Sequence, residues 1–227
     1  MIAVILNEAG FEYDIHSLVK AFYPESEVKV FTEGTKEILS DAGLPLLKIV
    51  RSSEKIQLLL YECPQEGWPG KEAPQREWLG KITPAFSKEI FLWDQDSSEK
   101  GSLAEPEILK RHVKNRLKQL IYQALSAYTN KNLPWGALTG IRPTKIAMGL
   151  LEGGRTKEEI FRYMKDTYYA SEEKITLSLE IAEREKKLLS HIHTRDGYSL
   201  YIGIPFCPTT CLYCSFTSYP ICKWKDR

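Results

Sequence analysis

Three closely spaced cysteines could support chemistry that other side chains cannot initiate. They lie in the segment Cys207-Pro-Thr-Thr-Cys211-Leu-Tyr-Cys214. Thiolates are soft ligands that suit zinc, copper(I) and iron-sulfur clusters, and three of them on one loop can converge on one centre. The C-x3-C-x2-C spacing offers three ligands, which suits a 4Fe-4S cubane with one open iron. An open iron can chelate S-adenosylmethionine through its amino and carboxylate groups, so the spacing predicts a cluster that cleaves this cofactor.

Zinc remains an alternative ligand for the same cysteines. Structural zinc sites close a tetrahedron with four ligands, and Cys222 could be the fourth beside Cys207, Cys211 and Cys214. Four of the five cysteines crowd into the last 21 positions, which indicates ligands in a reducing compartment rather than a disulfide framework. The fifth, Cys63, stands alone before Pro64 and reads as a small, partly buried apolar residue with no assigned role.

Composition argues for an ordinary globular chain. The 227 residues are 43% apolar, and 31 basic side chains nearly cancel 30 acidic ones, so no overall field favours nucleic acid or an anionic membrane surface. The N-terminus lacks a basic leader, and no apolar run approaches the roughly 20 residues of a membrane span. We therefore expect a cytoplasmic protein with no membrane span and no nucleic-acid partner.

The N-terminal part, residues 1–101, is predicted to be a small mixed α/β unit. Apolar or alternating patterns predict strands over residues 2–6, 27–31 and 55–62, and extended chain is expected near 78–82. A helical face formed by Ile15, Leu18, Val19 and Phe22 predicts a helix between the first two strands. Two breaks follow, at 63–74 and 94–102, and the second has the polar composition of a domain linker.

Residues 102–195 are predicted to be helical. Apolar positions at helical spacing predict a long helix from about 105 to Tyr128, and a short helix is expected over 144–151. A capping box, Thr156 with Glu159, opens another helix, and Ser171 starts one that runs nearly to His193. The turn at Asp196-Gly197 then leads into a predicted strand over 198–202, whose end delivers the cysteines.

With these elements in place, a family resemblance emerges. The segment Tyr201-Ile-Gly-Ile-Pro-Phe-Cys207 through Cys214-Ser-Phe216 resembles the radical S-adenosylmethionine superfamily, in its oxygen-independent coproporphyrinogen III oxidase branch. The upstream segment 133–145, Leu-Pro-Trp-Gly-Ala-Leu-Thr-Gly-Ile-Arg-Pro-Thr-Lys, resembles the Bacillus-type coproporphyrinogen dehydrogenase group. Together the two matches cover about half the chain, from the helix near 105 onward.

The resemblance implies a fold and a site. Cys207, Cys211 and Cys214 would bind the cluster, Tyr213 would pack on the adenine, and Tyr201 would lie near the sulfonium. Residues 196–227 would be the first strand and cluster loop of a truncated partial TIM barrel, giving an α+β chain in all. Chemistry in such barrels sits at the C-terminal ends of the strands.

The resemblance also implies a reaction for the parent enzyme. It would oxidatively decarboxylate coproporphyrinogen III, a tetrapyrrole, to protoporphyrinogen IX in heme biosynthesis. A low-potential electron donor would reduce the cluster, and an external acceptor would take the remaining electron. Two sequence departures bear on this substrate, because Gly203 replaces a His of the oxidases and heme chaperones, and Phe216 replaces a further Cys of the oxidases.

Other readings of the parent remain open. A heme chaperone of the same superfamily would keep the cluster for regulation, and a zinc-stabilised interaction module would have no cluster at all. Because the chain ends soon after Cys214, before the family's Gly-rich segment, we expect this chain alone to be inactive, and no catalytic residue is assigned.

Several further groups have simpler interpretations. The basic run between Lys110 and Lys118 could meet the propionates of a tetrapyrrole, but its spacing favours a solvated helix face. His191 and His193 are two apart and point in different directions on a helix, which makes a poor ligand pair. For Arg142 and Lys145, a role in domain packing or in a helix start competes evenly with anion binding. Tyr201 and Tyr213 could equally be core aromatic residues.

Overall fold

The computed structural model describes residues 1–33, 45–62, 82–93, 106–140 and 142–190, and parts of 192–223 (192, 197–198, 200–209, 211, 214, 216 and 218–223). The contacts divide the chain into two compact units, residues 1–185 and 186–227, which are described separately below. The described residues form five α-helices and a mixed sheet, which confirms the predicted α+β class. No helix in these ranges is long and apolar enough to cross a membrane.

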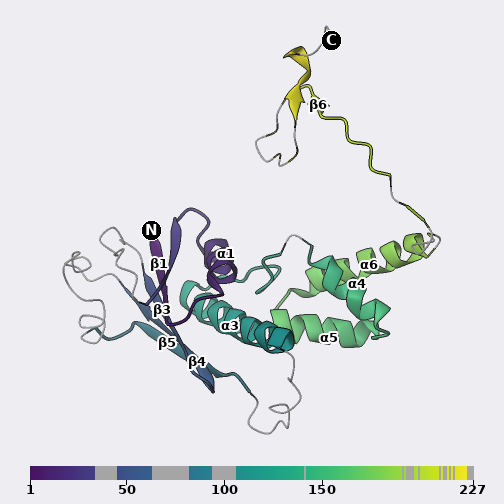
Figure 1. The fold of residues 1–227 in the computed structure, drawn as a ribbon. Helices are drawn as coiled ribbons and strands as arrows, with labels where there is room; N and C mark the ends of the chain where they lie inside the picture. The colour runs from purple at the N-terminus through teal and green to yellow at the C-terminus, as the bar shows by residue number, and fades with distance from the viewer. Residues whose placement is uncertain are drawn as a thin grey trace. The chain divides into compact units, whose positions relative to one another are not determined.

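A five-stranded sheet organises the first unit (Figure 1). Its order is β2-β1-β3-β4-β5, and β1 (Ile2–Leu6) runs parallel to both β2 (Val28–Thr32) and β3 (Leu46–Arg51). The strands β4 (Lys55–Tyr61) and β5 (Phe86–Phe91) continue the sheet in antiparallel fashion. The three predicted strands are confirmed to within one residue at each end, whereas β3 and β5 were not predicted.

Strand β1 is buried on both faces, as expected for a continuous apolar run between parallel neighbours. Ile2, Val4 and Leu6 enter the main core, and Ala3 and Ile5 enter a second cluster on the opposite face. Successive strand side chains point to opposite faces, so one five-residue run supplies both clusters. This double burial fixes β1 at the centre of the parallel part of the sheet.

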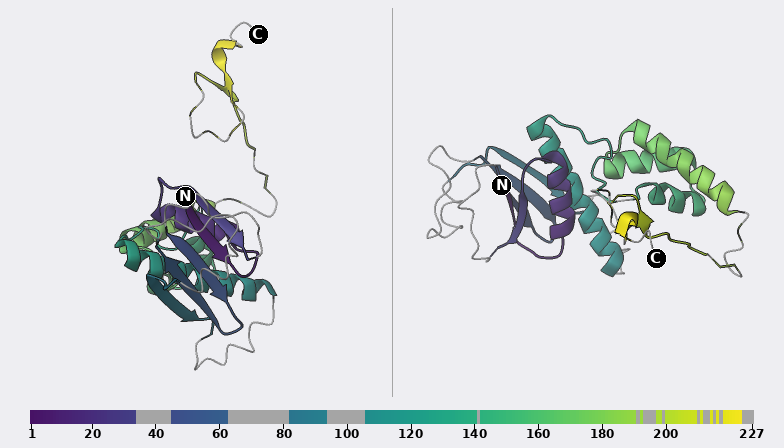
Figure 2. Two further views of the ribbon diagram at one scale, coloured as in Figure 1. Left: turned by 90° about the vertical axis from the view of Figure 1, so that its left-hand side faces the viewer. Right: turned by 90° about the horizontal axis from the view of Figure 1, so that it is seen from above.

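Helices α1 (Glu12–Phe22) and α3 (Pro106–Thr129) cover one face of this sheet (Figure 2). Helix α1 buries the four apolar residues of its predicted face, and α3 packs through Leu117, Leu120 and Ile121 into the same core. Full burial of such a side chain contributes about 1.5–3 kcal/mol. The long helix therefore shares its core with the sheet, although the sequence grouped it with the helices that follow.

Three shorter helices complete the first unit, apart from the end of the last one. They are α4 (Thr144–Glu152), α5 (Lys157–Tyr168) and α6 (Glu172–Leu189), and they pack around Met148, Ile160 and Met164. The predicted capping box is confirmed, because Thr156 accepts a hydrogen bond from the Glu159 amide and Glu159 accepts one from the Thr156 amide. Helix α6 ends at Leu189, four residues before the predicted end, after the exposed Lys186 and Lys187.

The chain around Leu133-Pro-Trp-Gly136 is hydrogen-bonded to the turn between α5 and α6. The amide of Ala137 donates to the Tyr168 carbonyl at 2.7 Å, and the amide of Ser171 donates to the Pro134 carbonyl at 2.9 Å. Between them Tyr169 adopts the left-handed conformation, with φ of 56°. Gly136, with φ of 57°, lies so close to the Tyr168 and Tyr169 backbone that a Cβ atom would overlap it. The motif is thus a packing element of the first unit.

The second unit contains little regular structure in its described part. The strand predicted over residues 198–202 is wrong, since the described residues there are irregular and highly exposed, with Tyr198 91% and Tyr201 83% accessible. A strand needs a hydrogen-bonding neighbour and a buried face, and the described residues around this segment supply neither. Two-residue strands follow, β6 (Phe206–Cys207) and β7 (Tyr219–Pro220), and then the 3-10 helix η2 (Ile221–Lys223).

Candidate functional site

The cysteines lie on a loop whose base is closed by β6 and β7. These strands pair in parallel, with Phe206 opposite Tyr219 and Cys207 opposite Pro220. The Tyr219 amide donates to the Pro205 carbonyl at 2.7 Å, and the Phe206 and Tyr219 rings pack with centroids 6.1 Å apart. Cys207 therefore stands at the base of the loop, and Cys211 and Cys214 follow within it.

All three cysteines are free thiols in the described structure. Cys207 and Cys214 are half-buried, whereas Cys211 is exposed. The Cys214 amide donates to the Cys211 carbonyl at 3.0 Å, which draws these two residues into one turn. The Cys214 thiol donates a weak hydrogen bond to the Phe216 carbonyl at 3.7 Å. Uncrosslinked and accessible thiols are the state in which cysteine can bind a metal after deprotonation.

The donor set fits a soft metal centre in its chemistry, because it consists of three thiols on one closed loop. The described residues contain no group of three His, Cys, Asp or Glu side chains already gathered as metal ligands. A metal site often takes its ligand geometry only when the metal binds, since ligand deprotonation and folding are coupled to binding. If the three cysteines of this loop bind a metal, their sulfur atoms would converge on loading.

Comparison with known proteins found a relative over part of the chain. The chain is 41% identical over 120 residues to the oxygen-independent coproporphyrinogen-III oxidase-like protein HemZ of Bacillus subtilis (strain 168). The match covers 52% of this chain and 24% of the relative. The chain therefore spans about a quarter of the length of the curated relative that it matches. No family model and no solved structure matches the chain.

This likeness supports a coproporphyrinogen oxidase-like family over part of the chain, in agreement with the resemblance of its motifs. The partial TIM barrel that the resemblance implied is not confirmed by the described fold. The assignments of Tyr201, of Tyr213 and of the three cysteines stay predictions.

The two tyrosines differ in what the structure says of them. Tyr213 lies outside the described residues. Tyr201 is exposed, and its ring lies beside Gly203, where a Cβ atom would meet the ring edge at 3.1 Å. Gly203, which has no side chain, therefore leaves room for the Tyr201 ring. Phe216, which replaces a family Cys, is 76% exposed.

The basic run of α3 divides into two groups. Arg116 donates to the Phe91 carbonyl through Nε at 2.9 Å, and Lys118 donates to the Thr139 hydroxyl at 2.9 Å. Burial lowers the pKa of Lys118, and the nearby Asp14 carboxylate opposes that effect. These two side chains hold α3 against its neighbours. Lys110, Arg111 and Lys114 instead line a hollow beside α1.

The remaining sequence candidates add no site within the described ranges. Arg142 and Lys145 are exposed near the start of α4, and the Lys145 amide donates to the Arg142 carbonyl at 3.1 Å, as in a helix start. Cys222 is exposed on η2. The residues His191, His193 and Cys63 lie outside the described part of the chain.

Sequence reasoning missed a polar group at the ends of β1 and β3. The Asn7 side chain donates to the Arg51 carbonyl at 2.7 Å and accepts from the Arg51 amide at 2.9 Å, and Arg51 also forms an ion pair with Glu8. A signal was present, because Asn7 and Glu8 directly follow an apolar strand. The partner strand β3 was not predicted, because its Leu-Leu-Lys-Ile-Val-Arg sequence mixes buried and half-buried positions without clear alternation.

Proposed function

We propose that Cys207, Cys211 and Cys214 bind a 4Fe-4S cluster that serves a radical S-adenosylmethionine oxidoreductase. The observation that carries this proposal is the C-x3-C-x2-C set of three free thiols on one loop. The 41% identity to a coproporphyrinogen-III oxidase-like protein supports the substrate class over part of the chain. Coproporphyrinogen III is therefore the proposed substrate of the whole protein.

The chain's own residues would have limited and definable roles. Three thiolates would each bind one iron and leave the fourth iron for the cofactor's amino and carboxylate groups. The bound cluster and cofactor together supply one-electron cleavage of a carbon-sulfur bond, which no side chain can perform unaided. In the overall reaction each of two propionates loses one hydrogen atom, one electron and carbon dioxide, and becomes a vinyl group. The bound cofactor would take the hydrogen atom, and an external acceptor would take the electron.

Anaerobic reconstitution with ferrous iron and sulfide tests the cluster. The expected result is a broad visible absorption band of a thiolate-ligated cluster, with equal iron and sulfide contents. Cys211→Ser should abolish the band, and Cys222→Ser is the matched control that should retain it. One zinc with no sulfide would overturn the iron-sulfur proposal, as would a requirement for Cys222.

The substrate needs a separate test. Coproporphyrinogen III is incubated anaerobically with S-adenosylmethionine and dithionite, and protoporphyrin is measured by its fluorescence after oxidation. We expect product with the native protein and none with Cys211→Ser. A reconstituted cluster without product formation, combined with tight heme binding, would exclude the oxidase activity and leave the cluster assignment in place.

A further inference from the structure

A groove lies at the C-terminal ends of the parallel strands β1 and β3. Three adjoining hollows of 460, 290 and 370 Å³ form it. The first and second share Gly10, Phe11 and Lys110, and the second and third share Glu8, Arg51 and Leu109. Because they share lining residues, the three hollows form one continuous groove within the first unit.

The strand order indicates why a ligand could bind at the ends of β1 and β3. From β1 the chain passes through α1 to β2 on one side, whereas β3 lies on the other side of β1. The connections therefore diverge at β1 and β3, and open α/β sheets bind ligands at such a switch point, beyond the carboxyl ends of the strands. The parallel part of this sheet, β2-β1-β3, resembles the doubly wound sheets for which that rule is known, whereas β4 and β5 are antiparallel.

The groove has an apolar lining. Phe11 enters from the start of α1, and Leu109 and Val113 come from one face of α3. Trp93, just after β5, extends the lining and stacks on the His112 ring with centroids 5.0 Å apart. Such a surface suits a flat apolar body, because ligand pockets combine apolar walls with a few placed polar groups.

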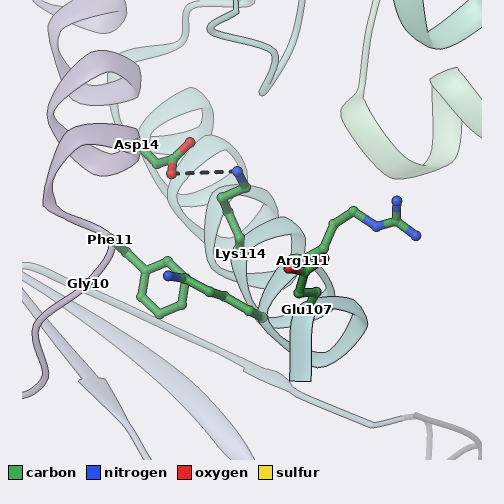
Figure 3. Close-up of a pocket in the computed structure, with 7 residues that line it drawn as sticks. Gly10, Phe11, Asp14, Glu107, Arg111 and Lys114 are labelled. Carbon is green, nitrogen blue, oxygen red and sulfur yellow. Dashed lines mark ion pairs between the residues drawn. The ribbon is translucent and has the colours of Figure 1, made fainter. Parts of the chain in front are cut away.

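The rim of the groove carries cations that differ in their pairing. Lys114 pairs with Asp14 at 3.7 Å (Figure 3), and Arg51 pairs with Glu8. Within the described ranges, by contrast, no carboxylate lies at ion-pair distance from Lys110 or Arg111. Figure 3 shows the Arg111 guanidinium extending away from the other labelled side chains. Lys110 and Arg111 thus have no carboxylate partner among the described residues, although Arg111 lies near enough to Tyr168 to oppose the rise in the pKa of that phenol, and Glu107 lines the same hollow.

The frame around these cations is fixed. The paired hydrogen bonds between the Asn7 side chain and the Arg51 backbone join the ends of β1 and β3. The Gly10 amide, just before α1, donates to the Glu12 carboxylate at 2.9 Å. Further along α3, the basic residues Arg116 and Lys118 are hydrogen-bonded to neighbouring segments, as described above. Hydrogen bonds therefore hold the walls of the groove, and Lys110 and Arg111 line its rim.

We propose that this groove binds a small organic anion, in which a flat apolar body packs on Phe11 and Leu109 and a carboxylate or phosphate group meets Lys110 and Arg111. Arginine suits bidentate contact with either anion, and lysine adds a point charge. The proposal concerns the first unit alone and does not rest on the cluster loop or on its proposed reaction.

Two probes test the proposal in the 227-residue chain by fluorescence or calorimetric titration. ADP supplies a flat base with phosphates, and coproporphyrin III supplies a flat tetrapyrrole with carboxylates. We expect at least one to bind, with about tenfold or greater loss of affinity in the double variant Lys110→Gln/Arg111→Gln. Binding should weaken as salt is raised, since exposed charges are screened. The probe that binds identifies the source of the anion.

Matched variants keep the test independent of folding. Arg162→Gln/Lys187→Gln removes the same charge from exposed positions of α5 and α6 and should leave affinity unchanged. The charge-conserving Lys110→Arg/Arg111→Lys should retain most of the binding if the glutamine variant folds poorly, and thermal unfolding checks the fold of each. The proposal is overturned if neither probe binds below about 1 mM (about −4 kcal/mol), or if the control pair weakens binding as much as the groove pair does.

Discussion

Gly136 carries the strictest steric constraint among the described glycines. Its φ is 57°, and a Cβ atom there would lie 2.5 Å from the Tyr169 carbonyl carbon and still closer to the Tyr168 carbonyl oxygen. Those neighbours are backbone atoms held by the α5 to α6 corner, so they cannot move aside easily. The glycine in this motif is required by packing rather than by chemistry.

Gly136→Ala should therefore destabilise the chain by about 3 kcal/mol, from the combined strain of a left-handed alanine and the overlap. Urea unfolding measures the loss. Gly149→Ala is the control, because Gly149 lies in α4 with nothing within 4 Å of its added Cβ. That change should stabilise by about 0.5–1 kcal/mol, since alanine favours helix. Equal effects at the two positions would contradict the packing role of Gly136.

Tyr128 links the end of α3 to the end of β4 and makes stability depend on pH. Its hydroxyl donates to the Glu62 carboxylate at 2.8 Å. Burial, this hydrogen bond and the nearby charge of Glu62 raise the pKa of Tyr128 from 10.0 to about 12. Burial also raises the pKa of Tyr168. Each folded phenol keeps a proton that the unfolded chain loses above its ordinary pKa.

Stability should therefore be constant with respect to Tyr128 below about pH 10 and should fall as pH rises toward 12, because the folded state then binds more protons. Urea unfolding at a series of alkaline pH values measures this slope. Tyr128→Phe should make the slope shallower, and Tyr13→Phe, at an exposed tyrosine of α1, should not change it. An unchanged slope in Tyr128→Phe would show that other groups govern the alkaline loss.

The kind of metal centre that the cysteine loop could hold was predictable from the sequence, because the spacing of the thiols limits which metals or clusters they can bind. The positions of these cysteines in the fold could not be predicted in the same way. Cys207 stands in a two-residue strand paired with Pro220, and that pairing depends on a contact across the loop rather than on local pattern. The sequence shows that Arg51 and Lys110 are charged, but it does not show that they line the same groove, because only the fold brings them together.

At the scale of elements, predictions succeeded where the local signal was redundant. The start of α5 combines a capping Thr156, the reciprocal Glu159 and apolar positions at helical spacing, and all of these point to the same helix start. Strands β3 and β5 lacked such agreement. Strand β5 alternates between half-buried and exposed residues, and its pairing with β4 determines its conformation.

Removal of the α5 cap should have a local and measurable cost. Thr156→Ala deletes an acceptor for the Glu159 amide, which lies 3.2 Å from the threonine hydroxyl, and should destabilise by about 1 kcal/mol. Thermal or urea unfolding measures the change. Thr176→Ala, at an exposed position inside α6, is the control and should be neutral or slightly stabilising. A loss at Thr176 equal to that at Thr156 would contradict the cap.

The predicted strand over residues 198–202 failed for the same reason that β5 was missed. An alternating or aromatic pattern shows that a segment could pair, but its partner must be present to make it a strand. Leu200, Ile202 and Ile204 are each more than 70% exposed in the described structure. Helix α3 shows the opposite case, since its pattern predicted a helix but not the sheet on which it packs.

The two units of the chain differ in how many of their apolar side chains are buried. The buried apolar residues of the described chain all lie at or before Ala182, within the first unit, whereas the second unit exposes many large apolar side chains. Strand order and the two-unit division could not be predicted, because both depend on contacts between segments distant in sequence. The stability of the chain should therefore come mainly from the first unit.

A chain shortened to residues 1–190, which retains all of α6, should keep its thermal midpoint within about 2 °C of the full chain. It should also lose all capacity for iron-sulfur reconstitution, because Cys207, Cys211 and Cys214 are removed. Circular dichroism melting and iron analysis measure the two outcomes. A midpoint lowered by about 5 °C or more would show that the second unit contributes to the stability of the first.

The two backbone hydrogen bonds at the α5 to α6 corner have a consequence for engineering the chain. They join Pro134 to Ser171 and Ala137 to Tyr168, so the segment that contains α4 and α5 begins and ends at this pair of hydrogen bonds. Lengthening a loop whose ends are already fastened costs little entropy, about 0.6 kcal/mol for each doubling. The exposed turn at Gly153 and Gly154 is the far end of that loop. A fluorescent or affinity tag inserted there would report on the protein without altering any residue that lines the groove.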